Sequence, residues 1–173
     1  MCCIMGYAGH DLLKETFTEY LLRTTSRGPD DQRVAETEFG LLGFGRLAIM
    51  GLTPEGMQPF FRGADCVACN GELYGFRFEK EILKRRGYKF CSDCDCEILL
   101  PLYYEYGLDM FRHMDAEFAL ILYDSRKDRL IAARDPIGIR PLFYGYSESG
   151  HIAFASELSL IHISEPTRLG MIS

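Results

Sequence analysis

The sequence EFALILYDSRKDRLIAARDPIGIRPLFYGYSESGHIAFA, residues 117–155, is the most regularly patterned part of the chain. Apolar runs of strand length alternate in it with short segments rich in Asp, Gly, Pro and Ser. These runs are Glu117–Tyr123, Arg129–Ala133, Leu142–Tyr146 and His151–Ala155. Consecutive strands joined by short turns predict antiparallel meanders.

Upstream of this region, further short runs predict more strands. Ile4–Ala8 opens the chain, Gly40–Met50 reads as a strand pair broken by glycines, and Asp65–Leu73 reads as a strand. The dipeptide Asn70-Gly71 is a strong turn signal and predicts an interruption of that last strand.

Helical spacing appears between the two strand regions and near the N-terminus. It predicts helices over Asp11–Arg23, over Phe76–Arg86, and from a cap at Ser92/Asp93 to Tyr106, with a kink at Pro101. Strands at both ends with helices between them predict an α+β fold in which helices cover the sheets.

The segment SLIHISEPTRLGMIS, residues 159–173, does not continue the preceding pattern and resembles translated sequencing-adapter sequence. We expect a single domain over residues 1–158, a non-native adapter-derived tail over residues 159–173, and a natural chain that continued past Leu158.

The bulk composition excludes several classes of function. The net charge of −6 argues against nucleic acid or an anionic membrane as the main partner. No apolar run approaches the roughly 20 residues that a membrane-spanning helix needs. The N-terminus MCCIMGYAGHD lacks the basic and apolar regions of a signal peptide, so we expect a cytoplasmic protein.

The seven cysteines raise the question of a metal site. Their odd number argues against a disulfide framework. The pairs Cys66-x-x-Cys69 and Cys91-x-x-Cys94 leave a zinc-binding module as an alternative. However, 21 residues (70–90) separate the pairs, and the members of the first pair lie three apart in a strand and so point to opposite faces. We expect most of these thiols to be small buried hydrophobes, with no metal ligands.

Cys2 is the strongest candidate for a nucleophile. Removal of Met1 before a small residue gives Cys2 a free α-amine, whose reference pKa of about 7.7–8.0 lies near neutrality. Such an amine can accept the proton of its own thiol, so no histidine is needed.

Other residue types suit the recognition of an amino acid. Arg46, in an apolar strand, can bind a carboxylate with its planar guanidinium, or form a structural ion pair. The amide of Asn70 and the backbone of Gly71 can bind a developing oxyanion, or form a hairpin turn. Asp95, at a predicted helix start, can accept an α-ammonium group, or cap the helix.

These residues lie within ordered motifs. The motifs are Met1-Cys2, Arg27-Gly28-Pro29-Asp30, Gly45-Arg46-Leu47-Ala48-Ile49, Asn70-Gly71-Glu72-Leu73-Tyr74, Asp95-Cys96-Glu97, Ala133-Arg134-Asp135-Pro136-x-Gly138-x-x-Pro141-Leu142-x-Tyr144 and Ala155-Ser156-Glu157-Leu158. In this order they resemble the class II (N-terminal nucleophile) glutamine amidotransferase domain of asparagine synthetase. The resemblance covers Met1 to Leu158.

The resemblance implies a four-layer α-β-β-α sandwich of the N-terminal nucleophile hydrolase type. It also implies that Cys2 is the nucleophile and that Asn70 and Gly71 form the oxyanion hole. The implied substrate-binding residues are Arg46, Leu47, Ala48, Ile49, Met50, Asn70, Gly71, Glu72 and Asp95. Arg46 would bind the carboxylate of glutamine, and Glu72 and Asp95 its amino group. Cys3 departs from the family pattern, which usually has Gly or Ser there.

The same resemblance implies glutamine as substrate, no cofactor in this domain, and a homodimer as one assembly. It further implies a C-terminal synthetase domain in cis, which uses ATP and Mg²⁺ to make asparagine from aspartate with the released ammonia. Glutaminase domains of the phosphoribosyl and hexosamine-phosphate branches, and of β-lactam-forming homologues, remain alternatives.

Overall fold

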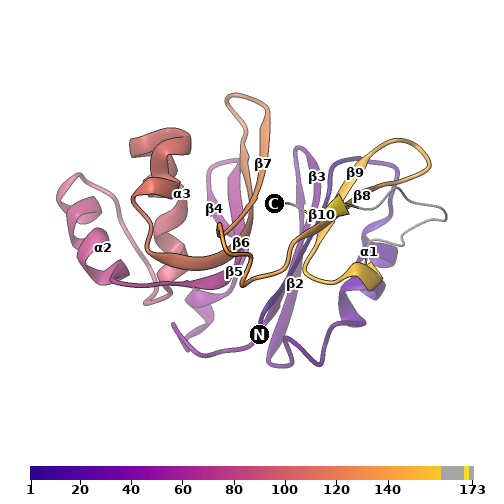
Figure 1. Cartoon of the computed structure of the whole chain (residues 1–173), viewed down its shortest axis with the longest axis horizontal. Helices are drawn as coiled ribbons and strands as arrows, with labels where there is room; N and C mark the ends of the chain where they lie inside the picture. The colour runs from indigo at the N-terminus through magenta and orange to yellow at the C-terminus, as the bar shows by residue number, and fades with distance from the viewer. Residues whose placement is uncertain (161–169, 172–173) are drawn as a thin grey trace.

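The computed structural model describes residues 1–160 and 170–171. Two antiparallel sheets stack face to face, and helices cover the outer face of each (Figure 1). The predicted four-layer α-β-β-α sandwich is therefore confirmed. Most of the predicted tail, 159–173, lies outside the described residues; within it, Leu160 is buried and Gly170–Met171 pairs with a strand of the first sheet.

The first sheet has the strand order β10-β8-β9-β1-β3-β2. Its strands are β1 (Cys3–Tyr7), β2 (Asp31–Thr37), β3 (Gly40–Arg46), β8 (Phe143–Tyr146), β9 (Ile152–Ala155) and β10 (Gly170–Met171). Alternate side chains of β1 reach opposite faces, as the strand period requires. Cys3 and Met5 pack with Phe17 and Leu21 of α1 (Lys14–Leu22), whereas Ile4 packs toward the second sheet.

The second sheet has the strand order β4-β5-β6-β7. Its strands are β4 (Phe60–Arg62), β5 (Asp65–Leu73), β6 (Ala116–Asp124) and β7 (Arg129–Arg134). Helices α2 (Phe76–Arg85) and α3 (Leu99–Tyr106) cover its outer face, and their buried Leu83, Leu99 and Leu102 pack on that face. The remaining turns of helix are 3₁₀ segments: η1 (Pro54–Gly56), η2 (Asp95–Ile98), η3 (Gly107–Arg112) and η4 (Leu158–Leu160). Within the described residues, no helix has the length and apolar character needed to span a membrane.

The four strands of residues 117–155 do not form one continuous meander. β6 pairs with β7 in the second sheet, and β8 pairs with β9 in the first. The chain crosses between the sheets after Asp135, whose carboxylate accepts hydrogen bonds from several backbone N–H groups. The donors are Phe118, Ile137, Gly138, Ile139 and Arg140. The crossing is thus held by one buried side chain.

Three local predictions are wrong. Gly40–Met50 contains one strand, β3, rather than a strand pair. The helix predicted from Ser92 divides into η2 and α3, and Pro101 is the third residue of α3, where a backbone N–H has no intrahelical acceptor to lose. The strand β5 runs through Asn70-Gly71, because β6 pairs with it as far as Leu73.

Replacement of Asp135 with alanine is expected to lower the free energy of unfolding by about 3 kcal/mol, because several buried N–H groups lose their acceptor. Burial raises the pKa of Asp135, but the hydrogen bonds from Ile139, Arg140, Gly138 and Phe118 outweigh it and lower the pKa. The folded pKa therefore lies below the unfolded value of about 3.9. The stabilisation is present above that value and is lost as pH falls through the folded pKa.

Urea unfolding at pH 7 and at several pH values below 4 measures this effect. Asp109→Ala is the control, since Asp109 is 71% exposed and its one ion pair with a described residue is to Arg112, at 3.7 Å. Equal unfolding midpoints for Asp135→Ala and the control would contradict the assigned role.

Candidate active site

A cavity of about 110 Å³ opens at one end of the stacked sheets and is lined by residues of both. Of the residues predicted from the sequence, all but Ala48 line it: Cys2, Arg46, Leu47, Ile49, Met50, Asn70, Gly71, Glu72 and Asp95. Ala48 is not among the lining residues, and its N–H donates to Asp30 Oδ2 at 2.7 Å. Segments far apart in the sequence therefore meet at one cavity.

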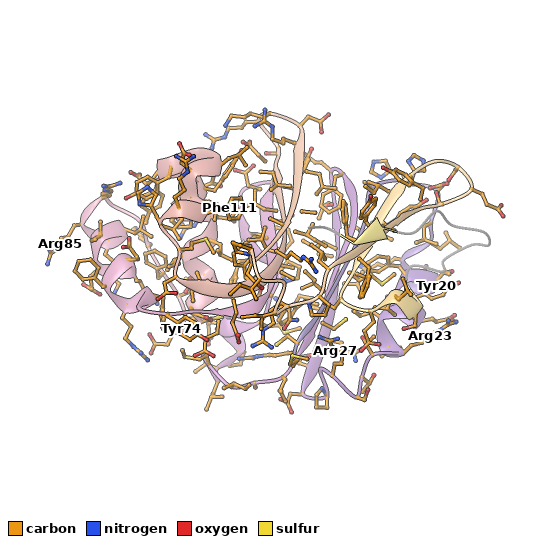
Figure 2. All side chains as sticks on the ribbon, in the orientation of Figure 1. Tyr20, Arg23, Arg27, Tyr74, Arg85 and Phe111 are labelled. Carbon is orange, nitrogen blue, oxygen red and sulfur yellow. The ribbon has the colours of Figure 1, made fainter. Side chains whose placement is uncertain are left out.

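The N-terminus lies at this cavity. Figure 2 shows Arg27 and Tyr74 in the lower part of the view, where Figure 1 marks the N-terminus. The α-ammonium group of Met1 donates to the carbonyl of Arg27 at 3.3 Å, and Met1 itself is exposed. Cys2 follows, immediately before β1.

The thiol of Cys2 is held by the backbone of Leu47. The Leu47 N–H donates to Cys2 Sγ at 3.3 Å, and Sγ donates to the Leu47 carbonyl at 3.5 Å. Burial raises the pKa of Cys2, and this effect exceeds the lowering by the Leu47 hydrogen bond and by the charge of Arg46. The thiol is therefore protonated at neutral pH and needs a nearby base to become a nucleophile.

Asn70 presents an unsatisfied donor to the cavity. Its side chain is buried, and its Nδ2 has no hydrogen-bond partner within the described part of the chain. Leaving such a group buried and unpaired costs about 1–3 kcal/mol. A buried donor without a partner beside a reactive thiol is the arrangement expected where a ligand oxygen completes the hydrogen bonding.

Gly71 adds a backbone donor on the same edge of β5. The Cys69 N–H donates to Gln58 Oε1 at 2.7 Å, and the Leu73 N–H donates to Asp95 Oδ2 at 2.8 Å. Alternate residues of an antiparallel strand direct their N–H groups to the same side, so the N–H of Gly71 points to this edge as well. The partner strand β4 covers only Asp65–Val67, which leaves the edge open at Gly71.

The absence of a side chain at Gly71 is also a packing requirement. A Cβ there would lie 2.4 Å from the carbonyl oxygen of Glu117 and 2.8 Å from Cα of Phe118, both backbone atoms of β6. Only glycine lets the two strands approach this closely at the cavity.

Arg46 supplies positive charge at the end of β3. It is 7% exposed, and it donates to the carbonyls of Thr53 (3.2 Å) and Gly51. Among the described residues it forms no ion pair, so the alternative of a structural ion pair receives no support. A buried guanidinium without a counter-ion favours an anionic ligand group.

Asp95 supplies negative charge on another wall of the cavity. It is the first residue of η2, is 4% exposed, and forms no ion pair among the described residues. Glu72, by contrast, is exposed to solvent. A guanidinium and a buried carboxylate in one small cavity match the opposite charges of an amino acid's carboxylate and ammonium groups.

Gln58 is a site residue that sequence reasoning missed. Its buried side chain bonds both backbone groups of Cys69, accepting from N–H at 2.7 Å and donating to the carbonyl at 3.0 Å. Beyond the end of β4, the Gln58 side chain makes the two hydrogen bonds to Cys69 that the backbone of a neighbouring strand would otherwise make. These bonds hold the backbone of β5 in place next to Asn70. A single glutamine in a loop carries no sequence pattern that could have indicated this.

The cysteine pairs do not converge on one zinc module. As predicted, Cys66 and Cys69 lie on opposite faces of β5: Cys66 packs in the core between the sheets, and Cys69 packs beneath the helices. Cys91 is exposed, whereas Cys94 is buried.

A family model described as a glutamine amidotransferase domain matches residues 1–169. The chain is 40% identical over 167 residues to a probable glutamine-hydrolysing asparagine synthetase of Acanthamoeba polyphaga mimivirus, covering 92% of this chain and 30% of the relative. It is 35% identical over 167 residues to glutamine-hydrolysing asparagine synthetase 2 of Arabidopsis thaliana, covering 93% and 28%. It is 35% identical over 137 residues to asparagine synthetase B of Escherichia coli, covering 78% and 24%. The chain thus spans less than a third of the length of these relatives.

The solved structures extend the likeness to the fold. Glutamine phosphoribosylpyrophosphate amidotransferase from B. subtilis superimposes with a TM-score of 0.81 at 20% identity, covering 99% of this chain and 49% of that one. An allosteric regulatory enzyme of purine biosynthesis gives a TM-score of 0.78 at 22% identity, covering 94% and 43%. At these identities the similarity shows a shared fold alone.

Proposed function

The chain belongs to the glutamine amidotransferase domain family, and on this basis we propose that it hydrolyses glutamine to glutamate and ammonia with Cys2 as the nucleophile. The observation that carries the proposal is the unpaired Nδ2 of Asn70 in the cavity that also contains the Cys2 thiol. A donor of this kind is suited to the charge that develops on a carboxamide oxygen during attack.

The first step needs a base for the Cys2 thiol, whose raised pKa keeps it protonated. We propose that the exposed Met1 is removed, which converts the backbone nitrogen of Cys2 into an α-amine. This amine accepts the thiol proton directly or through a water molecule. The thiolate then attacks the side-chain amide carbon of glutamine, and a carbon–sulfur bond forms.

The second step releases ammonia. The oxyanion accepts hydrogen bonds from Asn70 Nδ2 and from the backbone N–H of Gly71. As the carbon–nitrogen bond breaks, the α-ammonium group of Cys2 returns its proton to the leaving nitrogen, and a γ-glutamyl thioester remains. Water then attacks the thioester, the α-amine again accepts a proton, and glutamate and the free thiol are restored.

Recognition of glutamine follows from the two buried charges. Arg46 binds the α-carboxylate, and Asp95, with Glu72 at the solvent-exposed rim, binds the α-ammonium group. Leu47, Ile49 and Met50 line the cavity, and Ala48 fixes the Leu47–Met50 segment through its bond to Asp30.

Replacement of Asp95 with asparagine is expected to raise KM for glutamine by about 10- to 100-fold, with a smaller change in kcat. Asparagine keeps an oxygen that can accept the Leu73 N–H but removes the charge opposite the substrate ammonium. Steady-state kinetics of glutamate release measures the effect. Glu72→Gln is the matched control, because solvent screens an exposed carboxylate and its loss changes KM much less. Equal KM increases in the two variants would show that burial does not distinguish these carboxylates.

We propose that the released ammonia is used by a second domain of the natural protein. The named asparagine synthetases support a longer natural protein, in which a synthetase domain in cis uses ATP and Mg²⁺ to convert aspartate and ammonia to asparagine. The domain over residues 1–158, a cytoplasmic location and a homodimer also remain proposals. The solved phosphoribosylpyrophosphate amidotransferase shares the fold at 20% identity, whereas the named asparagine synthetases are 35–40% identical, so the phosphoribosyl branch receives less support.

The proposed activity is tested by incubating the purified chain with glutamine and measuring glutamate and ammonia together. Equal amounts of the two products are expected, and none from asparagine, whose side chain is one methylene shorter. A folded chain that begins at Cys2 and forms neither product would overturn the proposal that this chain hydrolyses glutamine by itself.

A further inference from the structure

The cavity is lined by more thiols than the proposed mechanism uses. Cys69 on β5, and Cys94 and Cys96 at the start of η2, line the same cavity as Cys2. All three are buried and free. Contact with Cys96, together with burial, raises the pKa of Cys94, so this thiol is not a second thiolate nucleophile at neutral pH.

The thiols of Cys94 and Cys96, together with the carboxylate of Asp95, lie close enough to share one ligand. The sulfur atoms of Cys94 and Cys96 and a carboxylate oxygen of Asp95 all lie within 4.8 Å of one another. The thiol of Cys96 also interacts with that of Cys69, which extends the group across to β5. Zinc–sulfur bonds of about 2.3 Å in a tetrahedron place ligand atoms about 3.8 Å apart, which lies within the spacing of the Cys94, Asp95 and Cys96 ligand atoms. Cys69, which interacts with Cys96, is the candidate for the fourth ligand.

The chemistry of the group selects the class of ligand. Thiolates favour soft or borderline cations, and tetrahedral sites rich in sulfur are typical of Zn²⁺. We propose that Cys69, Cys94, Cys96 and Asp95 form a binding site for a thiophilic divalent cation of the zinc class, adjacent to Cys2. On binding, each thiol gives its proton to solvent, and three thiolates and one carboxylate surround the ion. This site differs from the zinc module that the pairs Cys66-x-x-Cys69 and Cys91-x-x-Cys94 would form, because it includes neither Cys66 nor Cys91.

Occupancy of this site has a consequence for glutamine hydrolysis, and this consequence rests on the proposed function. A cation bound to Asp95 removes the carboxylate that the substrate ammonium needs, and its positive charge repels that group. Zinc-class cations are therefore expected to inhibit glutamate release in competition with glutamine. Binding of the cation itself does not depend on the proposed function.

The test is a titration of the full reduced chain with Cd²⁺, which gives an ultraviolet charge-transfer absorption when it binds thiolates. We expect saturation at one Cd²⁺ per chain, reversal by Zn²⁺, and loss of the absorption in Cys96→Ala. The matched controls are Cys66→Ala, which removes the thiol on the opposite face of β5, and Cys91→Ala, which removes an exposed thiol. Both are expected to keep the full absorption change. Because the readout is absorption, a chain inactive toward glutamine still tests the site.

Other outcomes would overturn the proposal. These are the absence of saturable absorption, an unchanged titration in Cys96→Ala, or loss of the absorption in Cys2→Ala, which would place the cation on the nucleophile. Far-ultraviolet circular dichroism establishes that each variant is folded. If Cys96→Ala unfolds, Cys94→Ser is titrated in its place, and full retention of the absorption there would also contradict the site.

Discussion

Replacement of Cys2 with alanine is expected to lower kcat for glutamate release by about 10⁴-fold or more, because no covalent intermediate can then form. The α-amine, the cavity and the donors of Asn70 and Gly71 stay in place in this variant. Its fold is expected to be unchanged, since Cys2 precedes β1 and is only partly buried. Glutamate release under saturating glutamine measures the loss.

The adjacent thiol provides the control. Cys3 is fully buried, and it packs against α1 on the other side of the first sheet from the cavity. Cys3→Ala removes a thiol one residue away and is expected to reduce stability modestly while retaining glutamine hydrolysis. Loss of activity in Cys3→Ala, with activity retained in Cys2→Ala, would show that the assignment of Cys2 as the nucleophile is wrong.

Replacement of Asn70 with aspartate is expected to lower kcat by about 10²- to 10³-fold with little change in KM. The variant preserves the shape of the side chain but exchanges the donor Nδ2 for an acceptor oxygen. Because the donor is needed by the oxyanion and not by the bound amide, the loss falls on the transition state.

Steady-state kinetics of glutamate release measures kcat and KM separately. Asn70→Ala serves as a second variant, since it removes the donor without adding charge, and it is expected to show a similar loss of kcat. A rise in KM with unchanged kcat would assign Asn70 to substrate binding and not to the oxyanion.

For the Asn70-Gly71 dipeptide, the sequence predicted a chemical role but gave the wrong local structure. Its residue types indicated oxyanion donors, but its turn propensity also predicted an interruption of the strand. The strand continues because β6 pairs along its whole length and Gly71 allows the close approach of Phe118. Long-range pairing of this kind outweighs local preference and is not visible in a short window.

The strand pattern of residues 117–155 was predicted well, but its division between two sheets was not. The periodicity is the same whether a strand pairs with the preceding or with a distant strand. The crossing lies at Asp135, whose carboxylate accepts backbone hydrogen bonds from Gly138 and Arg140, and a single Asp in a turn does not indicate to which sheet the next strand will pair. β2 and β4 were missed for simpler reasons: β2 has few apolar residues, and β4 has three residues in all.

The site shows a similar contrast. Cys2, Arg46 and Asp95 were predicted because charged or nucleophilic groups at those positions belong to specific motifs. Gln58 was not predicted, because its role depends on the position of the Cys69 backbone, which lies in another element. Clustering of Cys94, Cys96 and Cys69 could not be predicted either, since it requires η2 to lie against the edge of β5.

The role of the Cys2 α-amine is measured by comparing glutamate release from two preparations of the chain. One begins at Cys2, and the other carries one additional residue before it, with the N-terminal mass of each verified. The thiol is identical in both, but only the first has an amine in place of an amide. We expect turnover from the first preparation alone. Equal rates of glutamate release from the two preparations would contradict the assignment of Cys2 as an N-terminal nucleophile that uses its own amine as base.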